Sequence, residues 1–283
     1  MIATDMTPEP ENPEPENSER LRIALWQCAP LPPDTADAVA ANLARLDTVM
    51  ARSAGTADLL ITPEMFVTGY HVDVDVLARR ADPPGGPIAE RIADLCARHG
   101  LALLYGCAEI DPDAQVFNTI RLVDATRAQL ASHRKTHLFG DVDRSRFTAG
   151  HRPPPVVELG SWRLGLLICY EVEFGELVRS LALRGADLIC VPTANMPEYD
   201  EVQRILLPAR ALESQVYLAY ANYVGAEGDL RYGGLSVVLG PEGIALADAG
   251  RDETVVVAEL DRRALDASRA VRPYLAQRRP EVY

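Results

Sequence analysis

The sequence lacks the features that membrane proteins and nucleic-acid binders need. No stretch approaches the roughly 18 consecutive apolar residues that span a bilayer. Basic residues are a minority, because 28 Lys and Arg face 41 Asp and Glu and leave a net charge of -13, whereas a surface that binds nucleic acid is basic. The start also lacks the basic residues and the apolar core of a secretion signal. We therefore expect a soluble cytoplasmic protein with no membrane or nucleic-acid partner.

Cysteine is scarce as well. The five cysteines are an odd number and show no short paired spacing, so we expect neither a disulfide framework nor a zinc site. Reduced thiols are the ordinary state of cysteines in a cytosolic protein. The five are Cys28, Cys96, Cys107, Cys169 and Cys190.

The first twenty residues differ from the rest of the chain. They are rich in Pro, Glu and Asn, and they hold six acidic residues against Arg20 alone. Since they have little to bury, residues 1–20 are predicted to be a disordered acidic tail. Residues 21–283 are long enough to bury a sizeable core and are predicted to form a single domain.

From Arg20 onward, short apolar runs typical of buried strands alternate with segments of helical periodicity. This alternation predicts an α/β fold, although periodicity does not give the number of layers. Residues 136–155 lack a period and predict a long loop of the kind that often carries function. The clearest strand-like runs are 22–29, 58–63, 101–110, 162–169 and 187–192, and helical spacing covers 36–50, 88–96, 174–182 and 199–215.

Three chemically versatile residues stand at the ends of strand-like runs, which is where open α/β folds bind their ligands. Glu64 follows "DLLIT" by two residues, Lys135 closes "AQLASHRK" and Cys169 closes "LGLLIC". A cysteine at a strand-to-helix turn gains thiolate character from the helix start and from a nearby ammonium. A carboxylate can take and return its proton, and a lysine can hold the negative charge of a carbonyl oxygen under attack.

Each of these residues also has an ordinary structural interpretation. Free cysteines are among the most buried residues, so "LLIC" by itself suits a core position for Cys169. Cys107 and Cys190 have the same surroundings, and we interpret both as core residues. Taken singly, Glu64 suits the start of a helix and Lys135 a solvated strand end.

Histidines near the lysine open two alternatives. His133 and His137 flank Lys135, so a Cys-His dyad with Cys169 is conceivable if the loop folds back. A metal site made of His133, His137 and His151 is a weaker alternative, because the H-x3-H spacing has no firm third ligand. Spacing does not decide between these arrangements.

Three sequence blocks in the same order carry a resemblance to a known family. They are "LLITPEMFVTGY", "HRKTHLFGDVDRSRFTAG" and "GLLICYEVEFGE", and together they resemble the signature blocks of the carbon-nitrogen hydrolase family, also called the nitrilase superfamily. The likeness extends over nearly all of the chain from Arg20 to Tyr283. It implies an α-β-β-α sandwich, in which two stacked mixed sheets are flanked by helices, and assembly into a homodimer.

The resemblance also implies a mechanism. Its catalytic Glu, Lys and Cys map onto Glu64, Lys135 and Cys169. Glu64 would take the thiol proton, and the Cys169 thiolate would attack a small carboxamide, while Lys135 and the backbone N–H of Tyr170 stabilise the oxyanion. Ammonia would leave, and water would hydrolyse the thioester. The expected activity is that of an amidase that needs no metal and no cofactor.

The chain departs from the family pattern in three places. Asp143 stands where many members carry a second glutamate eight residues after the lysine, and its expected role is to position substrate and lysine. Glu171 replaces a common aspartate, and Gly175 replaces a common proline. Tyr70 and Asn195 are candidates for the substrate-binding surface.

The triad alone leaves other activities open. A nitrile hydrolase or an N-carbamoyl amine hydrolase uses the same triad, because the leaving group and the shape of the pocket decide between them. A member that keeps the fold without the chemistry is a further alternative. The blocks around "EMFVTGY" and "KTHLFGDVDRSRF" most resemble the amidase branch, which we therefore favour.

Overall fold

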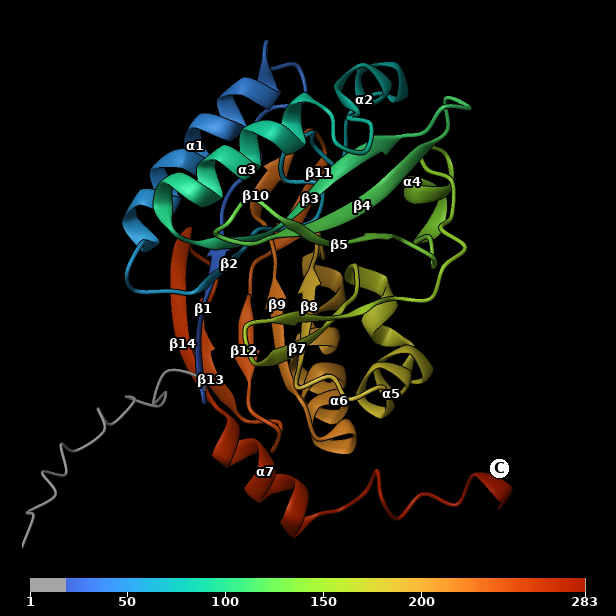
Figure 1. The fold of residues 1–283 in the computed structure, drawn as a ribbon. Helices are drawn as coiled ribbons and strands as arrows, with labels where there is room; N and C mark the ends of the chain where they lie inside the picture. The colour runs from blue at the N-terminus through green and yellow to red at the C-terminus, as the bar shows by residue number, and fades with distance from the viewer. Residues whose placement is uncertain (1–18, 283) are drawn as a thin grey trace, which may run out of the picture.

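The computed structural model describes residues 19–282, so the predicted tail at residues 1–20 lies almost wholly outside the described residues. Arg20 begins strand β1 (Arg20–Gln27) and so belongs to the folded part. Two six-stranded sheets stack face to face, with helices on their outer faces (Figure 1). The expected α-β-β-α sandwich of two mixed sheets is confirmed.

The first sheet is mixed, because antiparallel strands flank its parallel strands on both sides. It consists of β1, β2 (Leu59–Ile61), β3 (Ala102–Ile110), β4 (Val116–Val123), β5 (Gln129–Arg134) and β14 (Thr254–Asp261), in the spatial order β14-β1-β2-β3-β4-β5. β1, β2 and β3 are parallel, while the β14-β1, β3-β4 and β4-β5 pairs are antiparallel. Residues 124–128 join β4 to β5.

The second sheet repeats this mixed pattern. It consists of β6 (Val156–Leu159), β7 (Trp162–Leu166), β8 (Leu188–Pro192), β9 (Tyr217–Ala221), β12 (Val237–Leu239) and β13 (Ala245–Asp248), in the spatial order β13-β12-β9-β8-β7-β6. β7, β8 and β9 are parallel. A separate hairpin of β10 (Val224–Glu227) and β11 (Leu230–Gly233) stands apart from both sheets.

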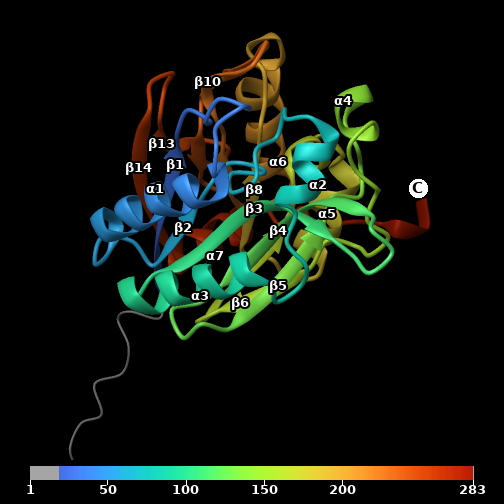
Figure 2. The same cartoon turned by 90° about the horizontal axis from the view of Figure 1, so that it is seen from above.

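Two pairs of helices cover the outer faces of the sheets (Figures 1 and 2). Helices α1 (Ala38–Ser53) and α3 (Pro87–His99) share an apolar cluster with the first sheet, and α5 (Gly175–Leu183) and α6 (Leu207–Ser214) share one with the second. A third cluster lies between the sheets. β2 shows the alternation of a strand buried on both faces, because Leu59 and Ile61 face the second sheet and Leu60 faces the helices.

Local sequence explains where helices begin and end. Pro87 occupies the first turn of α3, and Gly100 closes it with a left-handed φ of 58°. The helix predicted at 199–215 is instead divided into a 3-10 turn at Pro197–Tyr199, a π turn at Val202–Leu206 and α6. Pro208 is the physical reason, because it has no N–H to donate to the preceding turn.

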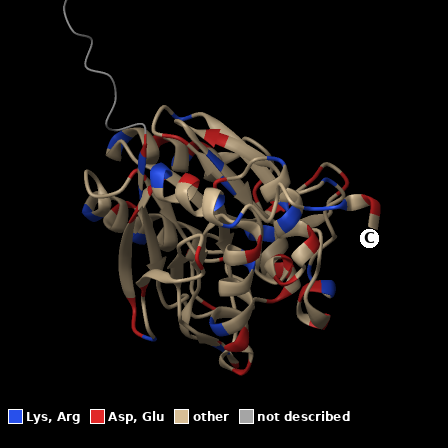
Figure 3. Cartoon of the chain, turned by 90° about the horizontal axis from the view of Figure 1, so that it is seen from below, with Lys and Arg blue, Asp and Glu red and all other residues tan. Residues whose placement is uncertain are grey.

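Short helices complete the chain, and charged residues fasten the last of them. α2 (Val74–Arg80) precedes α3, α4 (Gly140–Arg144) lies in the predicted loop 136–155, and α7 (Arg262–Val271) follows β14. Arg262 and Arg269 of α7 donate to the two carboxylate oxygens of Asp187, at 3.1 and 3.2 Å. Figure 3 shows, in the view from below, that basic and acidic residues are interspersed along the ribbon. No helix within residues 19–282 has the length and apolar character of a membrane span.

Candidate active site

Glu64 lies where the ends of the two sheets meet. It follows β2 by three residues, and its backbone N–H donates to Thr193 O, just past β8 of the other sheet, at 3.2 Å. Gly106 of β3 permits this placement, since a Cβ there would lie 2.2 Å from Met65 N. Met65 has a φ of 56°, so the chain turns sharply after Glu64. The Glu64 side chain is fully buried.

Lys135 follows β5 directly, and its ammonium joins two carboxylates. Nζ donates to Glu64 Oε1 at 2.8 Å and to Asp143 Oδ2 at 2.7 Å. Asn118 of β4 supports this arrangement, because its carbonyl accepts from Lys135 N at 2.8 Å and its Nδ2 donates to Glu64 Oε1 at 2.6 Å. Burial by itself would lower the pKa of Lys135, but the charges of Glu64 and Asp143 outweigh it and raise the pKa. The lysine is therefore held as a cation.

Asp143 reaches the lysine because α4 brings its backbone close. Its Oδ2 also accepts from Phe139 N at 2.8 Å, and its Oδ1 accepts from Tyr70 OH at 2.8 Å. Tyr70 is buried, and burial together with the charges of Glu64 and Asp143 raises its pKa well above the usual value. The structure thus places the predicted positioning residue Asp143 and the predicted binding residue Tyr70 in one hydrogen-bonded chain with Lys135.

Glu64 has the properties of a proton carrier. Burial raises its pKa and the Asp143 carboxylate adds to this, while Lys135 and Asn118 oppose it. Oε1 is occupied by two donors, whereas the buried Oε2 has no hydrogen-bond partner within residues 19–282. One oxygen is therefore fixed and the other is available.

Cys169 begins a 3-10 helix (Cys169–Glu173) three residues after β7 ends. Its φ of 46° lies in the left-handed region. This conformation is costly for residues other than glycine, and it is common at functional turns. Burial and the charge of Glu64 raise the pKa of the Cys169 thiol, while Lys135 and hydrogen bonds to Thr193 and Ala194 lower it. Thr193 contacts Cys169 and accepts from Glu64 N, and Glu64 in turn accepts from Lys135, so the three predicted residues lie in one site.

The other cysteines differ from Cys169 in exposure. Cys169 is partly exposed, whereas Cys28, Cys96, Cys107 and Cys190 are buried completely. Burial raises the pKa of each of these four thiols. Cys107 and Cys190 belong to apolar clusters, as the sequence predicts.

Glu171 is a structural member of the site whose contacts the sequence did not predict. Its buried carboxylate accepts from Ile168 N at 2.8 Å, from Thr136 N at 2.7 Å and from Thr136 Oγ1 at 2.6 Å. His133 Nε2 lies 2.9 Å from Oε2. Burial would raise the pKa of Glu171, but its hydrogen bonds to His133 and Thr136 lower it. One carboxylate thus ties the residue before Cys169 to the residue after Lys135.

The histidines make contacts other than those of the dyad or the metal site. His133 is paired with Glu171, and the ring of His137 packs against Phe174 with centroids 4.3 Å apart. Neither imidazole is hydrogen-bonded to Cys169 in the described part of the chain. No group of three His, Cys, Asp or Glu side chains within residues 19–282 is arranged to hold a metal ion.

The structure gives Tyr170 and Asn195 different surroundings. The Tyr170 ring makes edge contacts with Phe139 and Phe174, with centroids 5.3 and 5.0 Å apart, and its backbone N–H lies in the first turn of the 3-10 helix. Asn195 Nδ2 donates to Tyr199 O and to Gln203 Oε1, both at 3.1 Å. The described contacts of Asn195 therefore hold the segment after β8, and substrate binding by Asn195 stays a prediction.

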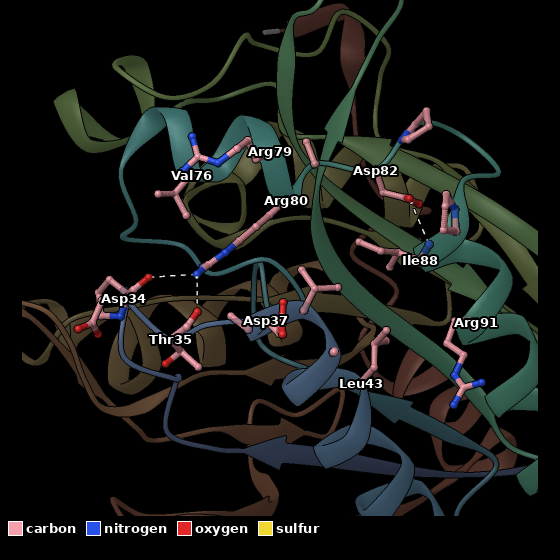
Figure 4. Close-up of a pocket in the computed structure, with 17 residues that line it drawn as sticks. Asp34, Thr35, Asp37, Leu43, Val76, Arg79, Arg80, Asp82, Ile88 and Arg91 are labelled. Atoms are coloured by element: carbon pink, nitrogen blue, oxygen red, sulfur yellow. Dashed lines mark hydrogen bonds between the residues drawn. The ribbon is translucent and has the colours of Figure 1, made fainter.

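A large pocket elsewhere on the surface does not contain this site. It has a volume of about 950 Å³ and lies between α1, α2 and α3 (Figure 4). Arg80 spans it and donates to Pro33 O and Thr35 O at 3.1 and 3.2 Å. Its lining includes neither Glu64 nor Cys169, so the chemical groups, and not the size of the hollow, locate the active site.

The sequence as a whole matches one family. The model of the family described as carbon-nitrogen hydrolase matches residues 22–270. The chain belongs to the carbon-nitrogen hydrolase family. The resemblance seen in the three sequence blocks is thereby confirmed, and this carbon-nitrogen hydrolase acts on bonds other than peptide bonds.

Several relatives are similar to this carbon-nitrogen hydrolase over nearly their whole length. A Pseudomonas protegens protein named "Hydrolase in pqqF 5'region" is 49% identical over 263 residues, which cover 93% of this chain and 90% of the relative. The (R)-stereoselective amidase of a Pseudomonas species is 37% identical over 260 residues, or 92% of each chain. A double mutant of the amidase from Nesterenkonia sp. AN1, solved with acrylamide, has a TM-score of 0.80 at 36% identity and covers 95% of this chain and 97% of its own.

Proposed function

We propose that the protein is a cysteine-dependent amidase that converts a small carboxamide to the carboxylic acid and ammonia. The observation that carries the proposal is the Lys135 ammonium held between Glu64 and Asp143, beside a partly exposed Cys169 at a strained turn. The amidase names of similar proteins support the choice of an amide. Glu64, Lys135 and Cys169 are the proposed catalytic residues.

Acylation follows from the placement of protons. Glu64 takes the Cys169 proton, and the sulfur attacks the amide carbon to form a tetrahedral oxyanion. Lys135 and the backbone N–H of Tyr170 stabilise the negative oxygen. Glu64 returns the proton to the amide nitrogen, the carbon–nitrogen bond breaks, and ammonia leaves a thioester on Cys169. The raised pKa of Glu64 suits this exchange, because a group that carries a proton both ways works best when its pKa is near the working pH.

Deacylation reuses the same groups. Glu64 takes a proton from water, and the resulting hydroxide attacks the thioester carbon. The carbon–sulfur bond breaks, the acid is released, and Cys169 regains its proton from Glu64. In this scheme Asp143 positions Lys135, and Tyr70 and Asn195 contribute to the surface that contacts substrate.

We further propose a homodimer that works in the cytoplasm, with residues 21–283 as one domain. The family resemblance supports the dimer, and the alternation of elements along the whole described chain supports the single domain. Sedimentation equilibrium should give twice the mass of 30.9 kDa. A monomer at micromolar concentration would contradict the dimer.

Ammonia release across a substrate panel tests the proposed activity. The panel contains small aliphatic amides, the corresponding nitriles and N-carbamoyl amines, and Cys169→Ala serves as the blank. We expect the highest kcat/KM for an amide. A higher value for a nitrile or an N-carbamoyl amine would assign the chain to that activity, and a wild type no faster than the blank would indicate a non-catalytic member.

Two variants separate this triad from a Cys-His dyad. Glu64→Gln should abolish hydrolysis, because the proton carrier is lost, whereas His137→Ala should retain most of it. The reverse pattern would overturn the proposed roles. Iodoacetamide should label Cys169 and leave the buried Cys107 and Cys190 unmodified.

A further inference from the structure

Glu227 is a buried carboxylate that the mechanism does not use. It ends strand β10 of the hairpin that stands apart from both sheets, and only 1% of the residue is exposed. Its Oε1 accepts from Tyr70 N at 3.1 Å, and its Oε2 accepts from His71 N at 2.8 Å and from Tyr232 OH at 2.7 Å. A buried charge is costly unless it is hydrogen-bonded, so these three donors account for the position of the carboxylate.

The residue held by Glu227 contacts the active site directly. The Tyr70 hydroxyl donates to Asp143 Oδ1 at 2.8 Å, and the other oxygen of that carboxylate, Oδ2, accepts from Lys135 Nζ at 2.7 Å. Because a carboxylate is planar, a bond that fixes Oδ1 also fixes the direction in which Oδ2 meets the lysine. Glu227 is therefore linked to Lys135 by an unbroken series of hydrogen-bonded residues.

The turn that leads to Tyr70 is held by its backbone from two sides. Arg80 Nη1 donates to Thr68 O at 3.1 Å, and the Glu227 carboxylate accepts from the N–H groups that follow. Gly69 lies between them with a φ of 90°, and a Cβ there would lie 3.1 Å from Glu227 Oε1 and 3.4 Å from Arg80 Nη1. An acid and a base thus approach the turn closely, and both bind its main chain.

The hairpin that carries Glu227 is itself fixed to the rest of the site. The ring of Tyr232 packs against that of Tyr223, with centroids 5.0 Å apart, and this contact directs the Tyr232 hydroxyl to Glu227. Gly233 N donates to Asn195 O, in the segment after β8, at 2.9 Å. The hairpin therefore contacts segments that follow strands of both sheets, and it can hold one in place relative to the other.

We propose that Glu227 is a positioning residue for catalysis, which keeps the Tyr70 hydroxyl on Asp143 and thereby directs the Lys135 ammonium toward the oxyanion. This inference rests on the proposed function and deepens it, because it assigns a role in the reaction to a hairpin that carries none of the chemical groups. Lys135 acts on charge that develops during the attack, so its displacement should lower the rate of the reaction.

Glu227→Gln tests this role. The amide offers one acceptor oxygen in place of two, so one of the backbone N–H groups of Tyr70 and His71 faces an NH2 group. We expect kcat/KM of the folded variant to fall by roughly ten- to a hundredfold, the range for lost charged hydrogen bonds and misplaced groups. It is measured with whichever amide, nitrile or N-carbamoyl amine the wild type hydrolyses best.

Asp229→Asn is the matched control on the same hairpin. Asp229 is an exposed acid whose Oδ1 lies 2.8 Å from Nε2 of His71, so it contacts the same turn through a side chain at the surface. Because an exposed pair contributes little, kcat/KM of this variant should stay within about twofold of the wild type. A loss as large as that of Glu227→Gln would assign the effect to the hairpin in general and overturn the proposal.

A double-mutant cycle with Tyr70→Phe separates positioning from a general structural effect. Tyr70→Phe removes only the hydroxyl that contacts Asp143, and by itself it should lower kcat/KM by a factor similar to that of Glu227→Gln. In the Tyr70→Phe background, Glu227→Gln should cost less than about twofold, because the contact that Glu227 maintains is already absent. Urea unfolding of all four proteins establishes that the rates refer to folded molecules.

The outcomes distinguish this inference from the proposed function. An equal loss on Glu227→Gln in both backgrounds would overturn the positioning role and leave the hydrolase intact. Wild-type kcat/KM in Tyr70→Phe would overturn it as well, even if Glu227→Gln did not fold. If the wild type hydrolysed no substrate faster than Cys169→Ala, the proposed function would fail, and this inference with it.

Discussion

Asp143 illustrates how a single shorter side chain can occupy the place of a longer one. The family resemblance implies a glutamate at this position, yet Oδ2 of the aspartate reaches Lys135 Nζ at 2.7 Å, because α4 and the turn at Gly140, with a φ of 51°, bring the backbone inward. Its negative charge helps to raise the pKa of both Lys135 and Glu64. The residue therefore sets the protonation of its neighbours without touching the thiol.

Asp143→Asn should shift the pH profile of hydrolysis. Loss of the negative charge removes one cause of the raised pKa of Glu64, so the pKa of Glu64 should fall. Since Glu64 must be unprotonated to accept the thiol proton, the acid limb of kcat/KM should move to lower pH. The profile is measured with a neutral amide, and Asp141→Asn on the exposed side of α4 is the control. An acid limb that stays in place or moves up would contradict the role of Asp143.

At the scale of elements, the site depends on contacts between strand ends that lie far apart in sequence. Glu171 is the clearest example, because its carboxylate joins the chain after β5 to the chain after β7. Gly106 is another, because its missing side chain lets the Glu64 turn lie against β3. Neither residue carries chemistry, yet both determine where the chemical groups lie.

Glu171→Gln should destabilise the fold at neutral pH by about 1–3 kcal/mol, because buried donors lose a charged acceptor. The lowered pKa of Glu171 means that its stabilising effect is present above the pKa of a free glutamate and is lost as pH falls through the folded value. Urea unfolding should therefore show a large difference from the wild type at pH 7 and a smaller one in acid. Glu158→Gln, at an exposed position of β6, is the control. A difference that grows in acid would contradict this assignment.

Gly106→Ala should lower the kcat/KM of the molecules that remain folded as well as their stability. The added Cβ would displace the backbone of Glu64 and Met65, and misplacement of a catalytic group by about 1 Å costs on the order of a hundredfold in rate. Leu104→Ala in the same strand provides the contrast. It should cost roughly 2–5 kcal/mol of stability with little change in the kcat/KM of the folded enzyme. Equal kcat/KM for Gly106→Ala and wild type would show that the turn adapts.

For the whole molecule, sequence periodicity predicted the strands and the α/β class but not the layers. An apolar run buried between two sheets has the same pattern as one buried under helices, so the two-sheet stacking came from the family resemblance. Glu64, Lys135 and Cys169 were predicted as candidates because each stands at the end of a strand-like run. Asn118 was missed, although a polar residue inside the apolar run "VFNTIRLV" is a usable signal.

Other features of the site depend on the three-dimensional arrangement of the chain. The strand predicted through Cys169 ends at Leu166, because the chain leaves the sheet before the strained turn. The contacts of Glu171 depend on segments that are distant in sequence, and composition carries no trace of them. Long-range pairing of polar groups is thus the part of this site that local pattern could not predict.

The hydrogen bond from Glu64 N–H to Thr193 O bears on how the site assembles during synthesis of the chain. Glu64 and Lys135 follow β2 and β5 of one sheet, and Cys169 follows β7 of the other. A nascent chain that extends only through β5 and Lys135 holds an acid and a cation with no thiol between them. The reactive centre therefore comes into being only when the two halves close on each other, and the thiol is not activated before that point.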